Sequence, residues 1–99
     1  MSYKIVWSGR ALKELSDAWA WYEDRSEGLG DRFQDAVFKK IAQIENDPIK
    51  EILRKSPYRE SIIKVFPYLI IFRVAKNKEI FIHSIFHMGR NPKKKYSKL

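Results

Sequence analysis

The two histidines of the chain lie four residues apart near its carboxyl end, at His83 and His87. In a β-strand both imidazoles would lie on one face, about 13 Å apart at ~3.3 Å per residue. One metal ion cannot bridge that distance, and the chain has no cysteine to complete a ligand set. We therefore expect no metal site and no cofactor, and we interpret His83, between Ile82 and Ser84, as structural.

His87 differs because the expected strand ends there, beside Gly89 and Arg90. Functional groups are common where a rigid strand passes into a loop. An imidazole can act as a general acid or base, and a guanidinium can hold a phosphate through two parallel hydrogen bonds. His87 and Arg90 are therefore candidate site residues.

Arg73 interrupts an apolar, strand-like run with the parity of Leu69 and Ile71, which places it on a sheet face. Arginine rarely occupies such a position without a partner. Either it contributes to a site for a phosphate or carboxylate, or it forms a salt bridge with Glu60 or Glu79. The sequence leaves both readings open.

A basic tail occupies about residues 90–99, where cationic side chains surround one aromatic ring. Such a segment fits neutralisation of a nucleic-acid backbone with base stacking, although a lysine-rich terminus is usually a solvated end. We predict target contacts for Arg90, Lys93, Lys94, Lys95 and Tyr96, with Lys98 as a further cation of the tail.

Other kinds of chemistry have no motif in this chain. There is no glycine-rich phosphate loop, no cysteine nucleophile and no recognisable serine–histidine–acid order. The paired carboxylates Glu14 with Asp17, and Asp31 with Asp35, are interpreted as exposed residues that favour solubility and the helix dipole.

The overall composition indicates one small cytoplasmic domain over residues 1–99. A net charge of +8 favours an acidic partner, and the absence of cysteine suits a reducing compartment. The start of the chain alternates like a strand and has no signal-peptide core. The longest apolar run, at residues 68–72, is far shorter than the roughly 18 residues that span a bilayer, so we expect no membrane contact.

The first half of the sequence has helical periodicity. A strand at residues 3–7 precedes a helix capped by Ser8, and Asp31, with Gln34 three positions on, caps a second helix that ends at Asp47-Pro48. The predicted apolar stripe of the first helix is Leu12, Leu15, Trp19 and Tyr22, widened by Ala11 and Ala18. The buried side of the second helix is Phe33, Val37, Ile41 and Ile44.

The second half alternates, with strands expected at 52–55, 59–65, 68–74 and 79–86 and a bend at 66–68. In the third predicted strand, Ile63 and Val65 would share a face. The fold class is therefore α+β, with an amino-terminal strand and a two-helix hairpin packed on one face of a mainly antiparallel sheet of four to five strands. The element order is β-α-α-β-β-β-β.

Both parities of the last two strands are apolar, yet two helices cover only one sheet face. By parity, Leu69, Ile71, Phe81 and Ile85 share one of the two faces, and parity alone leaves open which face is uncovered. An exposed face of this kind marks a binding surface for another chain. The alternative is that the tail or a second copy of the chain supplies the cover.

Order and residues together resemble the RelE/ParE superfamily, the toxins of bacterial type II toxin–antitoxin modules, often called plasmid stabilisation proteins. The resemblance lies in SGRALKELSDAWAWY and GLGDRFQDAV for the helices, NDP after them, and then YRESIIKVFPYLIIFRV and EIFIHSIFHMGRNP. It implies two helices on an antiparallel sheet and an acidic antitoxin that wraps the toxin in a hetero-oligomer, over either its open sheet face or its helical hairpin. Leu69, Ile71, Phe81 and Ile85 would then contact the antitoxin.

The superfamily divides by target, and this resemblance leaves two branches to weigh. RelE-like members cleave messenger RNA on the ribosome, and Arg73, His87, Arg90 and Tyr96 would be placed in that scheme, with His87 as general base or acid. ParE-like members inhibit DNA gyrase without a catalytic set, and the HMGRNP ending is closer to them. We predict a ParE-like toxin that binds gyrase; the alternatives are a ribosome-dependent endoribonuclease and a non-toxic, basic nucleic-acid-binding module.

Overall fold

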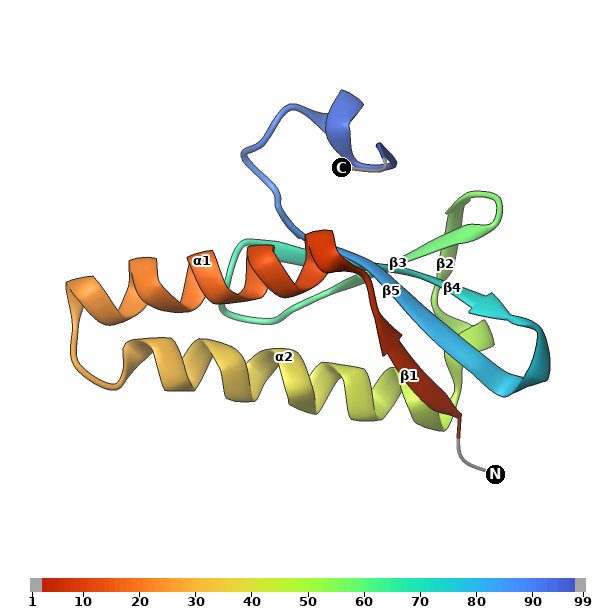
Figure 1. The fold of residues 1–99 in the computed structure, drawn as a ribbon, viewed down its shortest axis with the longest axis horizontal. Coiled ribbons are helices and arrows are strands. Elements are labelled where there is room, and N and C mark those ends of the chain that lie inside the picture. The colour runs from red at the N-terminus through yellow and green to blue at the C-terminus, as the bar shows by residue number, and fades with distance from the viewer. Residues whose placement is uncertain (1–2, 98–99) are drawn as a thin grey trace.

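The computed structural model describes residues 3–97, and its first half is a short strand followed by a helical hairpin (Figure 1). β1 spans Lys4–Trp7, α1 spans Gly9–Arg25 and α2 spans Leu29–Asn46. The two helices lie side by side and antiparallel, because the short connection between them leaves no other arrangement.

The start of α1 is fixed as the sequence predicts. Ser8 Oγ accepts a hydrogen bond from the Ala11 amide at 2.9 Å and donates one to the His83 carbonyl at 2.8 Å. The same hydroxyl therefore caps the helix and ties it to the last strand.

The predicted cap of α2 is wrong. Gly28, at φ 85°, occupies the N-cap position, and the Glu23 carboxylate accepts hydrogen bonds from the amides of Gly28 and Gly30. Since α1 supplies the oxygen atoms that the first turn needs, Asp31 is free to accept the indole N–H of Trp19 at 2.9 Å.

The helices bury one stripe each. In α2 the buried side is Phe33, Val37, Ile41 and Ile44, as predicted. In α1 it is Ala11, Leu15, Ala18 and Tyr22, whereas Leu12 is 51% exposed and does not belong to the stripe. The alanines define the contact line of α1 and let the helix lie close to the sheet.

The sheet has five strands in the order β1-β5-β4-β3-β2, with β1 parallel to β5 and every other pair antiparallel. β2 spans Ile52–Lys55, β3 Tyr58–Ile62, β4 Tyr68–Ala75 and β5 Glu79–His87. Short 3-10 helices lie at Pro48–Lys50, Lys76–Lys78 and Pro92–Lys94. The predicted α+β architecture is confirmed. None of the helices in residues 3–97 is long and apolar enough to cross a bilayer.

The third predicted strand is too long at its carboxyl end. β3 ends at Ile62, and Val65 lies in the β3–β4 loop with φ 79° and 87% exposure, so it shares no sheet face with Ile63. The backbone at Val65 is left-handed and cannot continue a strand.

A β-bulge in β5 reverses the parity of its second half. Ser84 pairs with Ile71 and Ile82 pairs with Phe72, so His83 is an extra residue that has no partner on β4. Ile82 and Ile85 consequently both pack into the core under the helices, the helix-side face. The predicted sharing of a face by Phe81 and Ile85 is therefore wrong, as is the sharing by His83 and His87.

The other face of the sheet, the outer face, is covered by the chain itself. Tyr58 and Tyr96 pack against a cluster of Leu69, Ile71 and Phe86, whose exposed fractions are 7%, 0% and 1%. The prediction that this face lacks a cover is wrong, because the C-terminal segment, residues 91–97, supplies Tyr96. A partner of the outer face would therefore meet this segment first.

Candidate functional site

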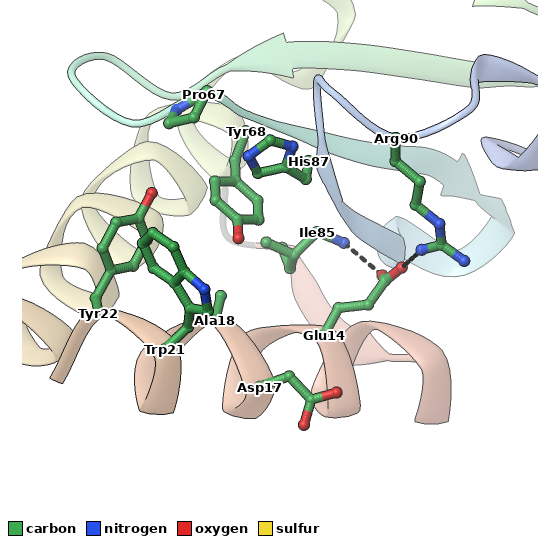
Figure 2. Close-up of a pocket in the computed structure, with 10 residues that line it drawn as sticks. All are labelled: Glu14, Asp17, Ala18, Trp21, Tyr22, Pro67, Tyr68, Ile85, His87 and Arg90. Atoms are coloured by element: carbon green, nitrogen blue, oxygen red, sulfur yellow. Dashed lines mark hydrogen bonds and ion pairs between the residues drawn. The ribbon is translucent and has the colours of Figure 1, made fainter. Parts of the chain in front are cut away.

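A pocket of about 530 Å³ lies between α1 and the carboxyl end of β5 (Figure 2). Its walls come from three parts of the chain: α1, the start of β4 with the loop before it, and the end of β5. The lining residues are Glu14, Asp17, Ala18, Trp21, Tyr22, Pro67, Tyr68, Ile85, His87 and Arg90. Aromatic rings form most of the interior, and the charged groups lie toward one end.

Glu14 is the polar centre of this site. Its Oε1 accepts hydrogen bonds from Ser84 Oγ at 2.7 Å and from the Ile85 amide at 3.0 Å. Its Oε2 accepts from Arg10 Nε at 3.0 Å and from Arg90 Nη1 at 2.6 Å. One carboxylate therefore joins α1, the bulged strand and the loop that follows it.

The topology explains why a carboxylate is needed here. β1 accompanies β5 only as far as Ile82, and the Ser8 amide then bonds to the Ile82 carbonyl as the chain turns into α1. Beyond that point the Ile85 amide has no strand to pair with, and a buried amide without a partner is costly. Glu14, one helical turn from Arg10, supplies the acceptor.

His87 lies on the helix-side rim of the pocket. Its ring meets the Tyr68 ring edge-on, with centroids 5.0 Å apart, and its Nδ1 accepts the Gly89 amide at 2.9 Å. Accepting at Nδ1 places the proton of the neutral imidazole on Nε2. Burial, and then the neighbouring Tyr22, raise the pKa of Tyr68 to about 12, so this phenol stays neutral beside the histidine.

Arg90 has its charge neutralised by Glu14 and its guanidinium 5.4 Å from the centroid of the Phe86 ring. It also lines a second hollow of about 430 Å³ on the outer face, together with Arg54, Leu69 and Lys95. Arg90 therefore stands at the end of the sheet, between the two faces.

Trp21 forms the far wall of the pocket and is 52% exposed. The Arg25 guanidinium lies 3.3 Å from the centroid of its ring. A large exposed ring held in place by an arginine is typical of a binding surface.

The C-terminal segment is held by polar contacts at several points. Arg10 donates to the carbonyls of Lys94 at 2.8 Å and Ser97 at 2.6 Å. Lys95 forms an ion pair with Glu60, and the Tyr96 hydroxyl donates to the same carboxylate. Burial, and then the Glu60 contact, raise the pKa of Tyr96 above its ordinary value.

The remaining cations of the tail differ in their exposure. Lys93 and Lys94 are exposed, whereas Lys95 and Tyr96 are partly buried by the contacts above. Lys98 lies outside the described residues.

Arg73 lies on the outer face, as parity predicts, with its guanidinium 4.7 Å from the centroid of the Phe81 ring. Within residues 3–97 it forms no salt bridge with Glu60 or Glu79. The Arg73 charge is therefore stabilised by a cation–π contact with Phe81, and the predicted alternative of a salt bridge is wrong.

His83 is buried on the outer face against the ring of Tyr58, at 4.8 Å. Burial, and then the nearby Arg10 charge, lower the pKa of this imidazole, and no partner for its Nε2 lies among residues 3–97. The same stretch holds no cluster of three or more groups able to bind a metal ion.

The structure does not bring the four candidate catalytic residues together. Arg73 and Tyr96 lie on the outer face, His87 lies on the helix-side rim, and Arg90 lies between them. Instead His87 and Arg90 line one pocket with the aromatic residues of α1, and within it Arg90 bonds to Glu14 while His87 lies beside Tyr68 (Figure 2).

Sequence reasoning missed Glu14 and Trp21. Glu14 was interpreted as an exposed solubility residue, yet its side chain is only 16% exposed. Its spacing of one turn from Arg10, next to the apolar Leu15, is the signal that would have placed it at the edge of the buried stripe.

With this geometry established, comparison with known proteins identifies the family. The model for the ParE toxin of type II toxin–antitoxin systems matches residues 5–92. The chain belongs to the ParE toxin family. Among curated protein sequences, none matches this ParE-family chain.

Two solved structures have the same fold as this ParE-family chain. A chain described as the chromosomal ParDE toxin–antitoxin system from P. aeruginosa is similar with a TM-score of 0.72 and 16% identity, over 87% of this chain and 96% of that one. A mutant of the E. coli toxin RelE in the free state is similar with a TM-score of 0.62 and 20% identity, over 87% of this chain and 83% of that one. The family match confirms the predicted resemblance to the ParE branch of the RelE/ParE superfamily, and the two structures confirm the fold.

Proposed function

We propose that this ParE-family toxin arrests growth by binding DNA gyrase, with no chemical step of its own, and that a cognate acidic antitoxin neutralises it. One observation carries the proposal beyond the family: the candidate catalytic side chains do not converge on a common point. The Tyr96 hydroxyl is bonded to Glu60, and the Arg90 charge is paired with Glu14. A transferring phosphate needs several such groups aimed at one place.

The contact surface for the target is the end of the sheet and the segment beyond it. Lys93 and Lys94 are exposed there and are available to an acidic partner, and Arg90 is exposed beside them with one guanidinium nitrogen bonded to Glu14. Lys95 and Tyr96 act mainly by holding the segment in this position, through Glu60. The aromatic pocket next to Arg90 offers a neighbouring apolar contact, which gives the surface a centre that excludes water.

The antitoxin binds across the outer face. We remove Ile71 and Ile85 from the predicted contact set, because Ile71 is fully buried and Ile85 lies on the helix-side face, where it lines the Figure 2 pocket. Leu69 lines the outer hollow and Phe81 is half-buried. Three exposed apolar side chains, Ile52, Ile62 and Met88, lie nearby and extend that surface, with Arg54 and Lys95 as partners for acidic residues.

Inducible expression of the wild-type chain tests this function. We expect growth arrest, relaxed plasmid DNA and intact messenger, and we expect co-expression of a cognate antitoxin to relieve the arrest. Growth arrest with unchanged supercoiling would contradict the gyrase target.

One observation favours the alternative of RNA cleavage. On the outer face Lys55 Nζ lies 5.6 Å from the centroid of the Tyr96 ring, and Tyr58, whose ring packs against Tyr96 at 5.2 Å, pairs with Arg73 across the strands. Cations beside aromatic rings suit single-stranded RNA. If this alternative holds, Arg73→Ala should lower codon-specific cleavage by about 100-fold, the scale of a lost catalytic group.

A further inference from the structure

The β3–β4 loop presents an apolar side chain in a backbone conformation that does not suit it. Val65 has φ 79° and is 87% exposed. A β-branched residue at positive φ is a genuine outlier, and glycine or asparagine would occupy the position with less strain. Because the side chain is exposed, the core gains nothing from it.

The residues around Val65 hold the loop rigidly. The Ile63 amide donates to the Tyr68 carbonyl at 3.0 Å, and the Tyr68 amide donates to the Phe66 carbonyl at 2.8 Å. The Phe66 ring packs edge-on against Tyr22 and Phe33, with centroids 5.0 and 5.2 Å away. The fold therefore needs Phe66, and Val65 is displayed next to it in a fixed position.

The surroundings of Val65 are cationic. Two shallow hollows, of about 290 and 280 Å³, share Ala36, Lys39, Lys64 and Val65 as lining residues. Lys40 lines the first hollow, while Arg32 and Asp35 line the second. None of the four cations forms an ion pair within residues 3–97.

We infer that this loop surface, made of Arg32, Lys39, Lys40, Lys64 and Val65, is a second contact with the protein target and fits an acidic surface with an apolar recess. The inference rests on the proposed function, because it assumes that the toxin acts by binding a protein. No residue of the surface lines the Figure 2 pocket or belongs to the C-terminal segment, so it is a separate site.

A protein fits this surface better than a nucleic acid does. A nucleic acid would use the cations of this surface to neutralise its phosphates, but it would have no use for Val65. Valine has neither a hydrogen-bonding group nor a flat ring that could contact a base. An apolar side chain surrounded by charges has instead the arrangement of a protein interface, with a dry centre and a polar rim. This also explains why the strained backbone carries valine: its side chain has a partner.

The test separates the loss of the side chain from the loss of the fold. Val65→Gly relieves the strain, so we expect a higher melting temperature together with about a 10-fold weaker effect on the target, the scale of one interface contact. The pair Lys39→Glu and Lys64→Glu should weaken the effect at least as much. The matched control is Lys4→Glu with Lys76→Glu, an equal change of charge at exposed positions outside the surface.

Two readouts are used, of which the first does not depend on the identity of the target. The first is the inducer concentration that halves growth rate, and the second is inhibition of supercoiling by purified gyrase. Weaker action of the Val65 and lysine variants, with wild-type action of the control, supports the inference. Equal action of all variants overturns it and leaves the proposed function intact.

The remaining outcomes are also decisive. If the wild type arrests growth but leaves gyrase unaffected, the proposed target fails and the growth comparison still decides the inference. A third outcome is that the double lysine variant loses activity while Val65→Gly keeps it. If the lysine variant also binds a DNA duplex of about 20 base pairs more weakly than the wild type, and its binding depends less on salt, the surface binds nucleic acid and the inference is wrong. If the wild type causes no arrest, both proposals are wrong.

Discussion

Glu14 shows how much one side chain can decide in a chain of this size. It accepts four hydrogen bonds, two of them from arginines, and fixes the position of Arg90 at the proposed target surface. The Arg10 side chain that it faces is only 5% exposed. Removing the negative charge would leave this cation in the interior without its counter-ion.

We therefore expect Glu14→Gln to lower the free energy of unfolding by roughly 3 kcal/mol, because breaking a buried ion pair strands the other charge. Urea denaturation measures this directly. The control is Asp17→Asn, one turn away, whose partner Lys13 is exposed, so its cost should stay below ~0.5 kcal/mol. Equal effects of the two substitutions would show that Glu14 is not the centre of the network.

His83 makes the stability of the fold depend on pH. Its pKa in the folded chain is lowered from 6.5, by burial and then by Arg10, so the unfolded chain binds the proton more readily. The stabilisation is thus present above pH 6.5 and is lost as the pH falls below it.

We expect the wild type to lose more stability than His83→Phe when urea unfolding is repeated at about pH 5 instead of about pH 8. Phenylalanine keeps the contact with Tyr58 and removes the titrating group. His87→Phe serves as the control, since His87 is exposed and lies on the opposite face. If wild type and His83→Phe lose stability equally, another group carries the acid dependence.

At the scale of elements, the C-terminal segment behaves as a cover that two residues of the fold hold in place. Arg10 binds its carbonyls and Glu60 binds its side chains, while Tyr96 closes the outer cluster. The exposed cations of the segment are therefore displayed from a fixed backbone, which lowers the entropy cost of binding.

Arg10→Lys should release this segment while keeping the charge. A lysine has one nitrogen where arginine uses three against Glu14, Lys94 and Ser97, so at most part of these bonds can survive. We expect faster amide hydrogen exchange in residues 91–97 and little change in α2. Lys13→Arg, at an exposed position of the same helix, is the control; exchange unchanged in Arg10→Lys would show that Arg10 does not hold the segment.

The sequence predicted elements well and faces less well. The strands, the helices and the buried side of α2 follow from periodicity, because the apolar residues of each element repeat regularly and face the same core. The face assignments of Ile85 and His87 failed because one extra residue at His83 reverses parity, and a run of apolar residues carries no mark of a bulge. The cover by Tyr96 depends on a contact with Glu60, thirty-six residues away, which periodicity does not report.

The candidate site was predicted only in part. His87 and Arg90 do lie at one end of the sheet, because both follow the last strand. Glu14 and Trp21 join them only through the packing of α1 across the end of β5, which is a tertiary contact. The prediction placed Arg73 on the correct face. Its side chain contacts the Phe81 ring, and the salt bridge with Glu60 or Glu79 that the sequence also allowed does not form among residues 3–97.

At the scale of the whole molecule, charge and shape point to the same kind of partner. The chain carries a net charge of +8, and some of its exposed cations gather on the C-terminal segment, at the outer hollow and around the β3–β4 loop. An acidic antitoxin that covers the outer face would neutralise part of this charge. Complementary charge of this kind mainly raises the rate of association, so toxin–antitoxin binding should slow steeply as salt is added.

The central claim is that the toxin acts by binding gyrase, and purified components test it most directly. Supercoiling of relaxed plasmid by gyrase should be inhibited when the purified chain is added, and the Glu14→Gln variant should inhibit less because Arg90 is no longer held. Unchanged supercoiling at every concentration of a folded, growth-arresting wild type would contradict the account.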